Sequence, residues 1–226
     1  MVIVLMGCDW SSGLQQLKAD ERNPKEPINE KIKLPDPKYD SNTSVEGALL
    51  KRRSTRTYKD GSLTLAEVSQ LLWAAQGVTD PRGLRTAPSA GALYPLELYV
   101  VAGDVNDLPD GIYKYRPHEH ELTMIVDGDK RTELSNASLH QPSVKDAAAV
   151  IVFSAVYERT TGKYGEKGIR FVCIEVGHAA QNIFLQAVSL NLGTVAVGAF
   201  DDEEAKKVMN MRDEEHPLYM MPVGKK

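Results

Sequence analysis

Cysteine is scarce in this chain, because Cys8 and Cys173 are the only two among 226 residues. Two cysteines are too few for a disulfide framework, and the apolar neighbours of Cys173 predict a reduced core residue. The five histidines are scattered and lack the spacing of metal ligands. No segment approaches the ~20 consecutive apolar residues of a membrane-spanning helix. The sequence therefore excludes a disulfide scaffold and predicts no metal site.

The motifs of common nucleotide-binding and hydrolase folds are missing as well. The chain has no Walker-type loop and no G-x-G-x-x-G motif, and Ser89 does not lie in a G-x-S-x-G elbow. The net charge of -4 argues against nucleic acid as the main partner, since phosphate-backbone binders are usually basic. A cofactor site would have to be assembled from separated segments, and the expected substrate is a small molecule.

The chain opens with a short apolar run, Met1–Met6, followed by Gly7 and Cys8. Leu5 to Cys8 resembles the lipobox of bacterial lipoproteins, in which the cysteine is lipidated. The run has no basic flank and is shorter than the roughly seven apolar residues of a signal peptide. We therefore expect a cytoplasmic protein. The alternative is a lipoprotein anchored to the membrane through Cys8.

The distribution of apolar residues predicts two regions. Residues 1–44 form a polar, proline-rich lead-in that we expect to be extended, and residues 45–226 form the folded domain. Thr64 and Glu67 fit a capping box that opens a helix. Residues 168–192 are predicted to form one long helix, whose apolar side chains cover most of its circumference. Such a helix is usually buried between a sheet and another body.

Six segments favour strands, because aromatic and β-branched residues alternate or run together in them. They are residues 96–102, 111–115, 121–125, 147–156, 195–200 and 218–223. Short helices are predicted after Ser44 and over residues 201–209. Strands and helices are mixed without a regular βαβ rhythm, which predicts an α+β fold with a largely antiparallel or mixed sheet.

The most informative feature of the sequence is a cluster from Lys51 to Arg56, with four cations and two hydroxyls in six residues. Arginine grips the planar, multi-oxygen geometry of phosphate bidentately, and neighbouring hydroxyls add donors. The cluster therefore indicates a site for a small phosphorylated ligand. A solvated run of surface charge is the alternative.

Three further segments could complete such a site. Thr86–Pro95 is a loop of small residues between two prolines, whose backbone can approach a flat ligand closely. Gly193–Phe200 ends in small residues that leave its backbone amides open, and Pro222–Lys226 places cations at a strand end. Their structural alternatives are an ordinary loop, tight packing of strand against helix, and a solvated tail.

Taken in order, these segments resemble the nitroreductase family of FMN-dependent oxidoreductases. The resemblance is carried by Arg-Arg-Ser-x-Arg from Arg52, Pro-Ser-x-Gly-x-x-Tyr-Pro from Pro88, Gln181-Asn182 in the long helix, Gly-Thr-x-x-x-Gly-x-Phe from Gly193 and a terminal Pro-Val-Gly-Lys. The second motif is similar to the branch that includes azoline (thiazole/oxazole-forming) dehydrogenases. The implied fold is a mixed, mainly antiparallel sheet flanked by helices, in an intertwined homodimer.

The resemblance implies an FMN site at the subunit interface, assembled from three groups of residues. The first holds the phosphate, ribityl chain and pyrimidine end of the flavin and comprises Arg52, Arg53, Ser54, Arg56 and Lys225. The second comes from the other subunit and covers the ring; it comprises Pro88, Ser89, Ala90, Gly91 and Leu93. The third lies against the flavin near its N5 atom and comprises Val197, Gly198 and Ala199.

The same resemblance implies hydride transfer from NADH or NADPH, through flavin N5, to a small organic acceptor such as a nitroaromatic or quinone. Many family members carry Glu where Gly198 stands, so the substrate preference of the classical nitroreductases does not carry over. Tyr94 is a candidate proton donor, with a core tyrosine as the alternative. An azoline-type dehydrogenase acting on a peptide and a non-catalytic flavin-binding protein are the alternative functions.

Overall fold

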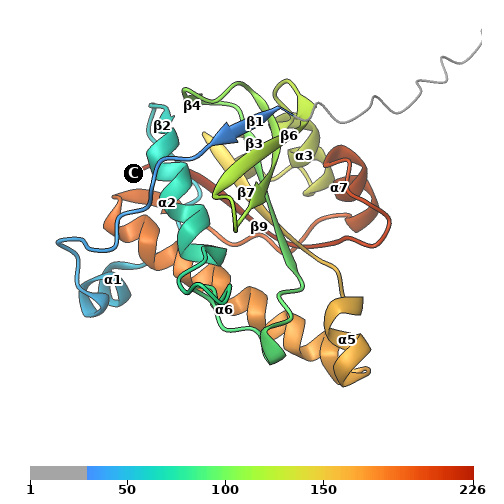
Figure 1. The fold of residues 1–226 in the computed structure, drawn as a ribbon. Coiled ribbons are helices and arrows are strands. Elements are labelled where there is room, and N and C mark those ends of the chain that lie inside the picture. Colours follow the sequence, from blue (N-terminus) through green and yellow to red (C-terminus); the bar gives the residue numbers. More distant parts are fainter. Residues whose placement is uncertain (1–29) are drawn as a thin grey trace, which may run out of the picture.

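The computed structural model describes residues 30–226, which form an antiparallel sheet of seven strands in the order β1-β6-β5-β3-β7-β9-β8 (Figure 1). Its strands are β1 (Lys31–Lys33), β3 (Leu96–Ala102), β5 (Gly111–Arg116), β6 (Glu121–Asp127), β7 (Ala149–Ala155), β8 (Leu192–Thr194) and β9 (His216–Lys225). Two short strands, β2 (Leu63–Thr64) and β4 (Val105–Asn106), pair in parallel beside it. The predicted α+β class and the mainly antiparallel sheet are confirmed.

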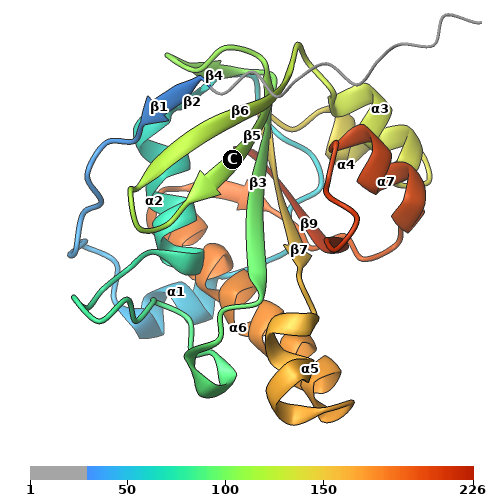
Figure 2. The same cartoon turned by 45° about the vertical axis from the view of Figure 1, so that its right-hand side comes forward.

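Helices cover both faces of the sheet (Figures 1 and 2). On one side lie α2 (Leu65–Gln76) and the long helix α6 (Lys167–Ser189), and on the other lie α3 (Arg131–Ala137), α4 (Pro142–Lys145) and α7 (Asp202–Val208). Two further helices are α1 (Val45–Lys51) and α5 (Glu158–Tyr164), and Ala90–Ala92 form a 3-10 turn. The sheet is therefore the middle layer of a three-layer sandwich.

Strand β3 shows why both faces of the sheet are apolar. Leu98 and Val100 pack in the core under α2 and α6, whereas Tyr99 and Val101 belong to the core under α3 and α7. Successive side chains of a strand point to opposite faces. A strand buried on both sides is therefore hydrophobic throughout, as the predicted central strand β7 also is.

Local capping signals fix the start of α2. The Thr64 hydroxyl accepts from the Glu67 amide at 3.2 Å, and the Glu67 carboxylate accepts from the Thr64 amide at 2.7 Å. This reciprocal pair is the predicted capping box. At α1 the cap is a single bond: the Ser44 hydroxyl accepts from the Gly47 amide at 3.0 Å.

Two local predictions are wrong. Cys173 is exposed on α6 rather than buried in the core, because its position on the helix turns away from the sheet. Residues 195–200 do not form a strand; β8 ends at Thr194, and beyond it only Val197 makes an isolated bridge, to Met220. After Thr194 the chain pairs with β9 only at Val197, so the amides of Gly198 and Ala199 make no backbone hydrogen bond to a described residue.

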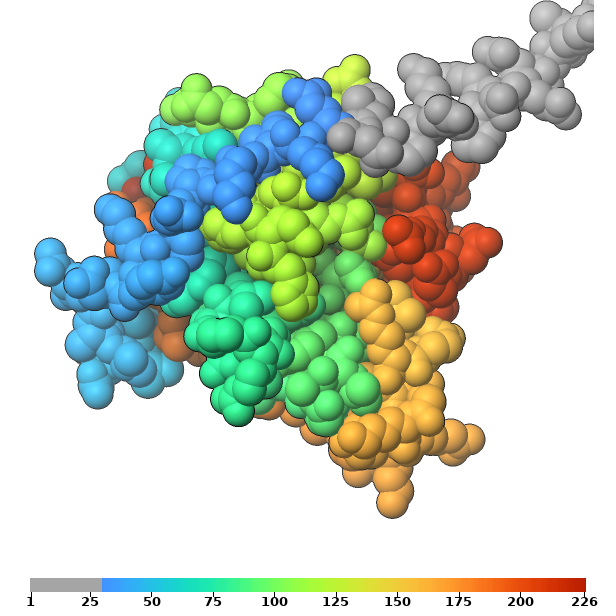
Figure 3. All heavy atoms as spheres, viewed as in Figure 1, coloured from blue at the N-terminus to red at the C-terminus, as the bar shows by residue number. Residues whose placement is uncertain are grey.

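Part of the lead-in is ordered against the domain. Strand β1 pairs with β6 at the edge of the sheet, and the chain then crosses the outside of the molecule toward α1 (Figure 3). Leu34 is buried, which anchors this crossing. The lipobox-like start and Cys8 lie outside the described residues. Within residues 30–226, no helix is long and apolar enough to cross a membrane.

Candidate cofactor site

The arginine cluster begins where α1 ends. The guanidinium of Arg52 lies 5.1 Å from the centre of the Phe184 ring on α6, and Arg53 donates to the carbonyl of Leu50 at 3.1 Å. Arg53, Ser54 and Arg56 are exposed and Arg52 is half-buried. Among the described residues, none of the three arginines has an ion-pair partner. Within the described part of the chain, their positive charge is therefore not compensated.

The cluster lies beside the β8–β9 edge of the sheet. The Thr55 amide donates to the Thr194 carbonyl at 2.9 Å, and the Lys59 amide donates to the Lys225 carbonyl at 3.0 Å. A Cβ at Gly193 would lie 2.7 Å from the Thr55 side chain, so glycine permits this close approach. The sheet edge and the cluster thus form one continuous surface.

Lys225 lies beside Lys59, just after the cluster, and its ammonium is already paired. Its ammonium lies 2.7 and 2.9 Å from the two carboxylate oxygens of Glu67 on α2. Burial tends to raise the pKa of Glu67, but hydrogen bonds from Lys225 and Thr64 lower it overall. An anion at the cluster would have to share Lys225 with this carboxylate.

Gly198 and Ala199 lie further along the same edge and are exposed. Val197 is held to β9 by two backbone hydrogen bonds with Met220, of 2.8 and 2.9 Å. A Cβ at Gly198 would meet only the Tyr219 ring, at 3.8 Å. Neither amide, of Gly198 or of Ala199, donates a hydrogen bond to a described residue. Two adjacent donors are therefore open to a ligand.

A groove of about 310 Å³ lies along α6. It is lined by Cys173, Val176, Gly177, Ala180, Gln181, Phe184 and Tyr219. Of these residues, Phe184 lies 5.1 Å from the Arg52 guanidinium, and Tyr219 is the ring that a Cβ at Gly198 would meet. A groove with an arginine beside it suits a ligand that carries an anionic group.

A larger hollow, of about 980 Å³, lies between the lead-in and the helices α2 and α6. It is lined by Asp36, Tyr39, Trp73 and Gln186 among others, and by none of the predicted site residues. The smaller groove is not lined by predicted site residues either, but two of its lining residues lie beside them: Phe184 beside Arg52, and Tyr219 beside Gly198. We therefore take the smaller groove as the candidate cofactor site.

The predicted loop, Pro88–Pro95, lies elsewhere on the same chain, against α5 and the first half of α6. Gly91 has a φ of 65°, which glycine adopts without strain. The Tyr94 amide donates to the Ser89 hydroxyl at 2.9 Å and closes the turn. In contrast, the arginine cluster contacts the second half of α6. The structure brings the cluster, Val197–Ala199 and Lys225 together, but not the loop.

The loop lies next to two residues that the sequence did not single out. A Cβ at Gly91 would lie 2.8 Å from the Tyr164 hydroxyl and 3.1 Å from the Lys163 ammonium. Both residues end α5, a short polar helix that was not predicted. The adjacent Lys163 and Tyr164, just before the long helix, were the sequence feature that could have pointed to them. Tyr94 itself is half-buried, and its hydroxyl accepts from the Arg85 amide at 3.1 Å.

A second unexpected feature is a buried polar cluster beneath the loop, made by Gln76, Arg85 and Glu175. Gln76 is fully buried and Glu175 is 2% exposed. Burial raises the pKa of Glu175 to about 7, although the Ser89 hydroxyl and the Arg85 charge both lower it. Within residues 30–226 no group of acidic, histidine or cysteine side chains could hold a metal ion.

Comparison with known proteins identifies close relatives over most of the chain. A sequence profile described as the nitroreductase family matches residues 49–225. A Methanocaldococcus jannaschii protein named as a nitroreductase is 49% identical over 195 residues, covering 86% of this chain and 96% of that protein. The crystal structure of a Ralstonia eutropha protein named as a nitroreductase has a TM-score of 0.76 at 30% identity, covering 89% of this chain and 92% of that one.

Two more distant relatives carry names that state a process or a cofactor. The microcin B17-processing protein McbC of Escherichia coli is 26% identical over 157 residues, covering 66% of this chain and 57% of that protein. The NADPH:FMN oxidoreductase of Vibrio harveyi, solved with NAD+, has a TM-score of 0.57 at 19% identity, covering 79% of this chain and 66% of that one. The latter similarity is one of fold.

Proposed function

The chain belongs to the nitroreductase family, and on that premise we propose that it is an FMN-dependent oxidoreductase. Its electron donor is NADH or NADPH, and its acceptor is a small organic molecule such as a nitroaromatic or a quinone. The observation that carries this proposal is the groove on α6, two of whose lining residues lie beside predicted site residues: Phe184 beside Arg52, and Tyr219 beside Gly198.

Two groups of residues would bind different parts of FMN. Arg52, Arg53 and Arg56, with the Ser54 hydroxyl, suit the phosphate, which arginine grips bidentately. The amides of Gly198 and Ala199 suit the polar edge of a flat ring. Bound FMN would supply the hydride-accepting atom N5. The protein would supply position, exclusion of water and a positive field over the pyrimidine end.

The site needs a second subunit, because the Pro88–Pro95 loop contacts the other half of α6. Exposed apolar side chains on two helices mark the surface where that subunit would pack. They are Val45, Leu49 and Leu50 on α1, and Ile169 and Ile174 on α6, all at least 49% exposed. Contiguous exposed apolar surface is typical of protein interfaces. A homodimer would cover it and bring a partner's loop to each groove.

An azoline-type dehydrogenase acting on a peptide is the second candidate. It is favoured by the similarity to McbC, named as a microcin-processing protein, and by the Lys163 and Tyr164 side chains beside Gly91. An acceptor panel separates the two functions. Turnover with quinones or nitroaromatics and NAD(P)H supports the reductase, whereas oxidation of an azoline peptide without NAD(P)H supports the dehydrogenase.

The test begins with the colour of the purified protein. Bound oxidised flavin absorbs near ~450 nm, and NADH or NADPH added without oxygen should bleach that band. A yellow protein that neither donor bleaches would be a flavin-binding protein without the proposed reductase activity. A colourless protein that takes up no added FMN would exclude the proposal.

Arg52→Ala and Arg56→Ala test the phosphate end of the groove. A hydrogen bond to a charged group contributes about 1.5–3 kcal/mol, so each variant should weaken FMN binding by roughly 10- to 100-fold. Arg82→Ala is the matched control, since Arg82 is exposed and pairs only with Asp80 near its own turn. Full retention of flavin by the double variant through gel filtration would show that the site is elsewhere.

A further inference from the structure

Tyr94, at the end of the Pro88–Pro95 loop, has a backbone conformation that a bulky residue rarely adopts. Its φ is 45°, and that of Ala92, two residues earlier, is 52°. In this left-handed region the Cβ of any residue other than glycine is crowded, so the conformation persists only where the surroundings hold it. Strained residues of this kind cluster at functional sites. Contacts with other parts of the chain must therefore hold Tyr94 in this shape.

Four contacts surround Tyr94, one for each part of the residue. Its amide donates to the Ser89 hydroxyl at 2.9 Å, and its carbonyl accepts from the Arg159 guanidinium at 3.0 Å. Its hydroxyl accepts from the Arg85 amide at 3.1 Å, and the Arg85 guanidinium lies 4.4 Å from the centre of its ring. The backbone, the ring and the hydroxyl of Tyr94 are therefore all engaged within its own chain.

The two arginines that contact this residue are themselves fixed to buried side chains. Nη1 of Arg85 donates at 2.9 Å to Gln76, which is fully buried at the end of α2. Arg159 forms an ion pair with Glu97, and the other carboxylate oxygen of Glu97 lies 3.2 Å from the buried Lys114 on β5. The two arginines therefore join the end of the loop to two separate parts of the interior.

The side of the loop that faces solvent is formed by small residues and one proline. Pro88, Gly91 and Ala92 are exposed, whereas the Tyr94 side chain is half-buried against Arg85. A surface without long side chains permits the close approach of a flat ring. A loop that is already held in its binding conformation also loses little conformational entropy when a ligand binds.

We propose that Tyr94 is a positioning residue: its ring, hydroxyl and backbone hold the Pro88–Pro95 loop in the one strained conformation that covers the flavin. Tyr94 acts on the flavin only through the shape of the loop, and no proton transfer by its hydroxyl is involved. The link to the flavin rests on the proposed function. The link between Tyr94 and the shape of the loop does not.

Amide hydrogen exchange of the flavin-free protein, corrected for intrinsic exchange rates, measures how firmly the loop is held. The amides of Ala92 and Tyr94 report on it, because they donate to the Ser89 carbonyl and hydroxyl. Tyr94→Phe removes one hydrogen bond, so these amides should exchange roughly 2- to 10-fold faster. Tyr94→Ala also removes the ring from Arg85, and the increase should exceed roughly tenfold.

Tyr113→Phe is the matched control. Tyr113 lies on β5 and donates its hydroxyl hydrogen to the Pro109 carbonyl at 2.7 Å, so this variant also loses one hydrogen bond to the backbone. Its global stability should fall by a similar amount, but the exchange of the loop amides should not change. Unchanged exchange in Tyr94→Phe, or an equal increase in Tyr113→Phe, would overturn the proposal. Tyr94→Phe loses a single oxygen atom and decides the test if Tyr94→Ala does not fold.

Addition of FMN separates this inference from the proposed function. If both hold, FMN at about 100 times its dissociation constant should slow the exchange of the loop amides by up to roughly 100-fold. If the protein binds no FMN, the proposed function fails, and the exchange rates of the flavin-free variants still decide whether Tyr94 holds the loop. If FMN binds without slowing this exchange, the loop does not cover the flavin and the positioning role is wrong.

Turnover of the flavin-loaded protein separates the positioning role from proton donation. If Tyr94→Phe slows turnover but leaves the exchange of the loop amides unchanged, the hydroxyl acts in the reaction itself, which contradicts the proposal.

Discussion

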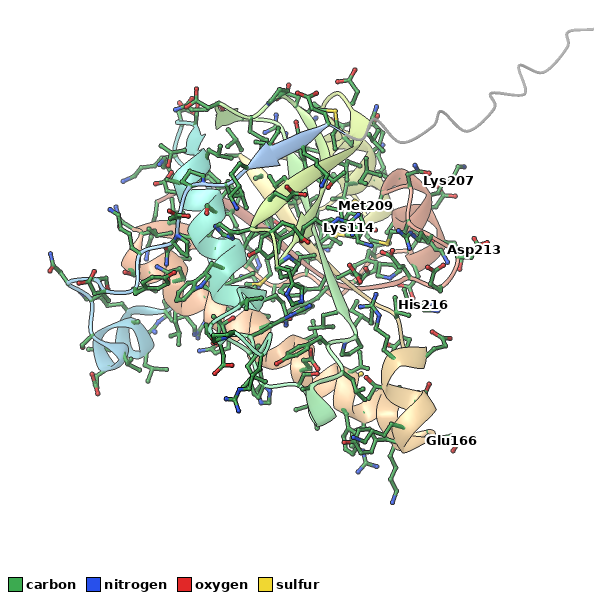
Figure 4. All side chains as sticks on the ribbon, viewed as in Figure 1. Lys114, Glu166, Lys207, Met209, Asp213 and His216 are labelled. Atoms are coloured by element: carbon green, nitrogen blue, oxygen red, sulfur yellow. The ribbon has the colours of Figure 1, made fainter. Side chains whose placement is uncertain are left out.

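The protein buries two charged clusters, one on each face of its sheet, and they differ in how completely they are paired. On the face that α3 and α7 cover, the Lys114 ammonium lies 2.6 Å from Glu215 and 3.2 Å from Glu97, inside the molecule (Figure 4). Glu215 also accepts from Tyr99 at 2.5 Å. Near the loop, Glu175 and Arg85 each keep an atom without a partner among residues 30–226.

This difference indicates which of the two clusters stabilises the fold. Lys114 and Glu215 satisfy one another deep in the core, where breaking one partner leaves an uncompensated buried charge. Such a network fixes the packing of β3, β5 and the segment before β9. The Glu175 cluster has unused hydrogen-bonding capacity and contacts a loop rather than a strand. We therefore expect mutation of the first cluster to lower the free energy of unfolding. Mutation of the second cluster should mainly alter how that free energy depends on pH.

The largest effect should come from Lys114→Met. Removing the cation leaves Glu215 buried without its countercharge, and the free energy of unfolding should fall by about 3–5 kcal/mol. Urea denaturation measures this loss. Lys207→Met is the control, because Lys207 is exposed on α7 (Figure 4) and should change stability by less than about 0.5 kcal/mol. If Lys114→Met lowers the free energy of unfolding by less than about 1 kcal/mol, the Lys114 cluster does not stabilise the fold as proposed.

Glu175→Gln should have the opposite sign at neutral pH. Its folded-state pKa of about 7 lies above the ordinary value of 4.5, so the folded protein holds its proton longer than the unfolded chain. Stability is complete below pH ~4.5 and is lost as the pH rises through about 7. Relative to the natural protein, the variant should gain on the order of 3 kcal/mol between pH 4.5 and 8.

Thermal or urea denaturation at several pH values measures that gain, and comparison with the natural protein cancels the other carboxylates. The sign of the change in the free energy of unfolding tests the prediction more stringently than its size. A variant that loses stability relative to the natural protein as the pH rises would show that Glu175 is stabilised as a carboxylate, as the paired cluster is.

The smallest effect on stability should come from Arg159→Ala. Arg159 contacts both Glu97, in the Lys114 cluster, and Tyr94, in the loop. Arg159 pairs with Glu97 and donates to the Tyr94 carbonyl at 3.0 Å, but its side chain is 42% exposed. Exposed ion pairs contribute little, so the global loss should be about 1 kcal/mol or less. Exchange of the loop amides should nevertheless increase. Arg170→Ala, exposed on α6, is the control; an equal rise in exchange there would show that Arg159 does not hold the loop.

Local signals predicted much of the fold. The capping box at Thr64, the apolar run of β7 and the helical spacing of α6 depend on residues close in sequence, and the structure has all three. The short helices α3 and α5 were missed because their sequences are polar and weakly periodic. The segment after Thr194 was misread as a strand because its composition, but not its pairing, is that of a strand.

The cofactor site was predictable in parts. The segment around Arg52, the segment around Gly198 and Lys225 were singled out separately, and the fold places them along one edge. The pairing of Lys225 with Glu67, 158 residues away, carried no local signal. Whether the Pro88–Pro95 loop reaches a second subunit's groove is a prediction that the oligomeric state will test.

By itself, the sequence determined the elements with strong periodicity and the motifs that resemble one family. The tertiary structure alone decided which charges are paired. Lys114 meets Glu215 across 101 residues of chain, and Glu175 lies under Ser89 only because α6 packs beneath the loop. Charge and pKa depend on burial and on neighbours distant in sequence, which no local pattern records.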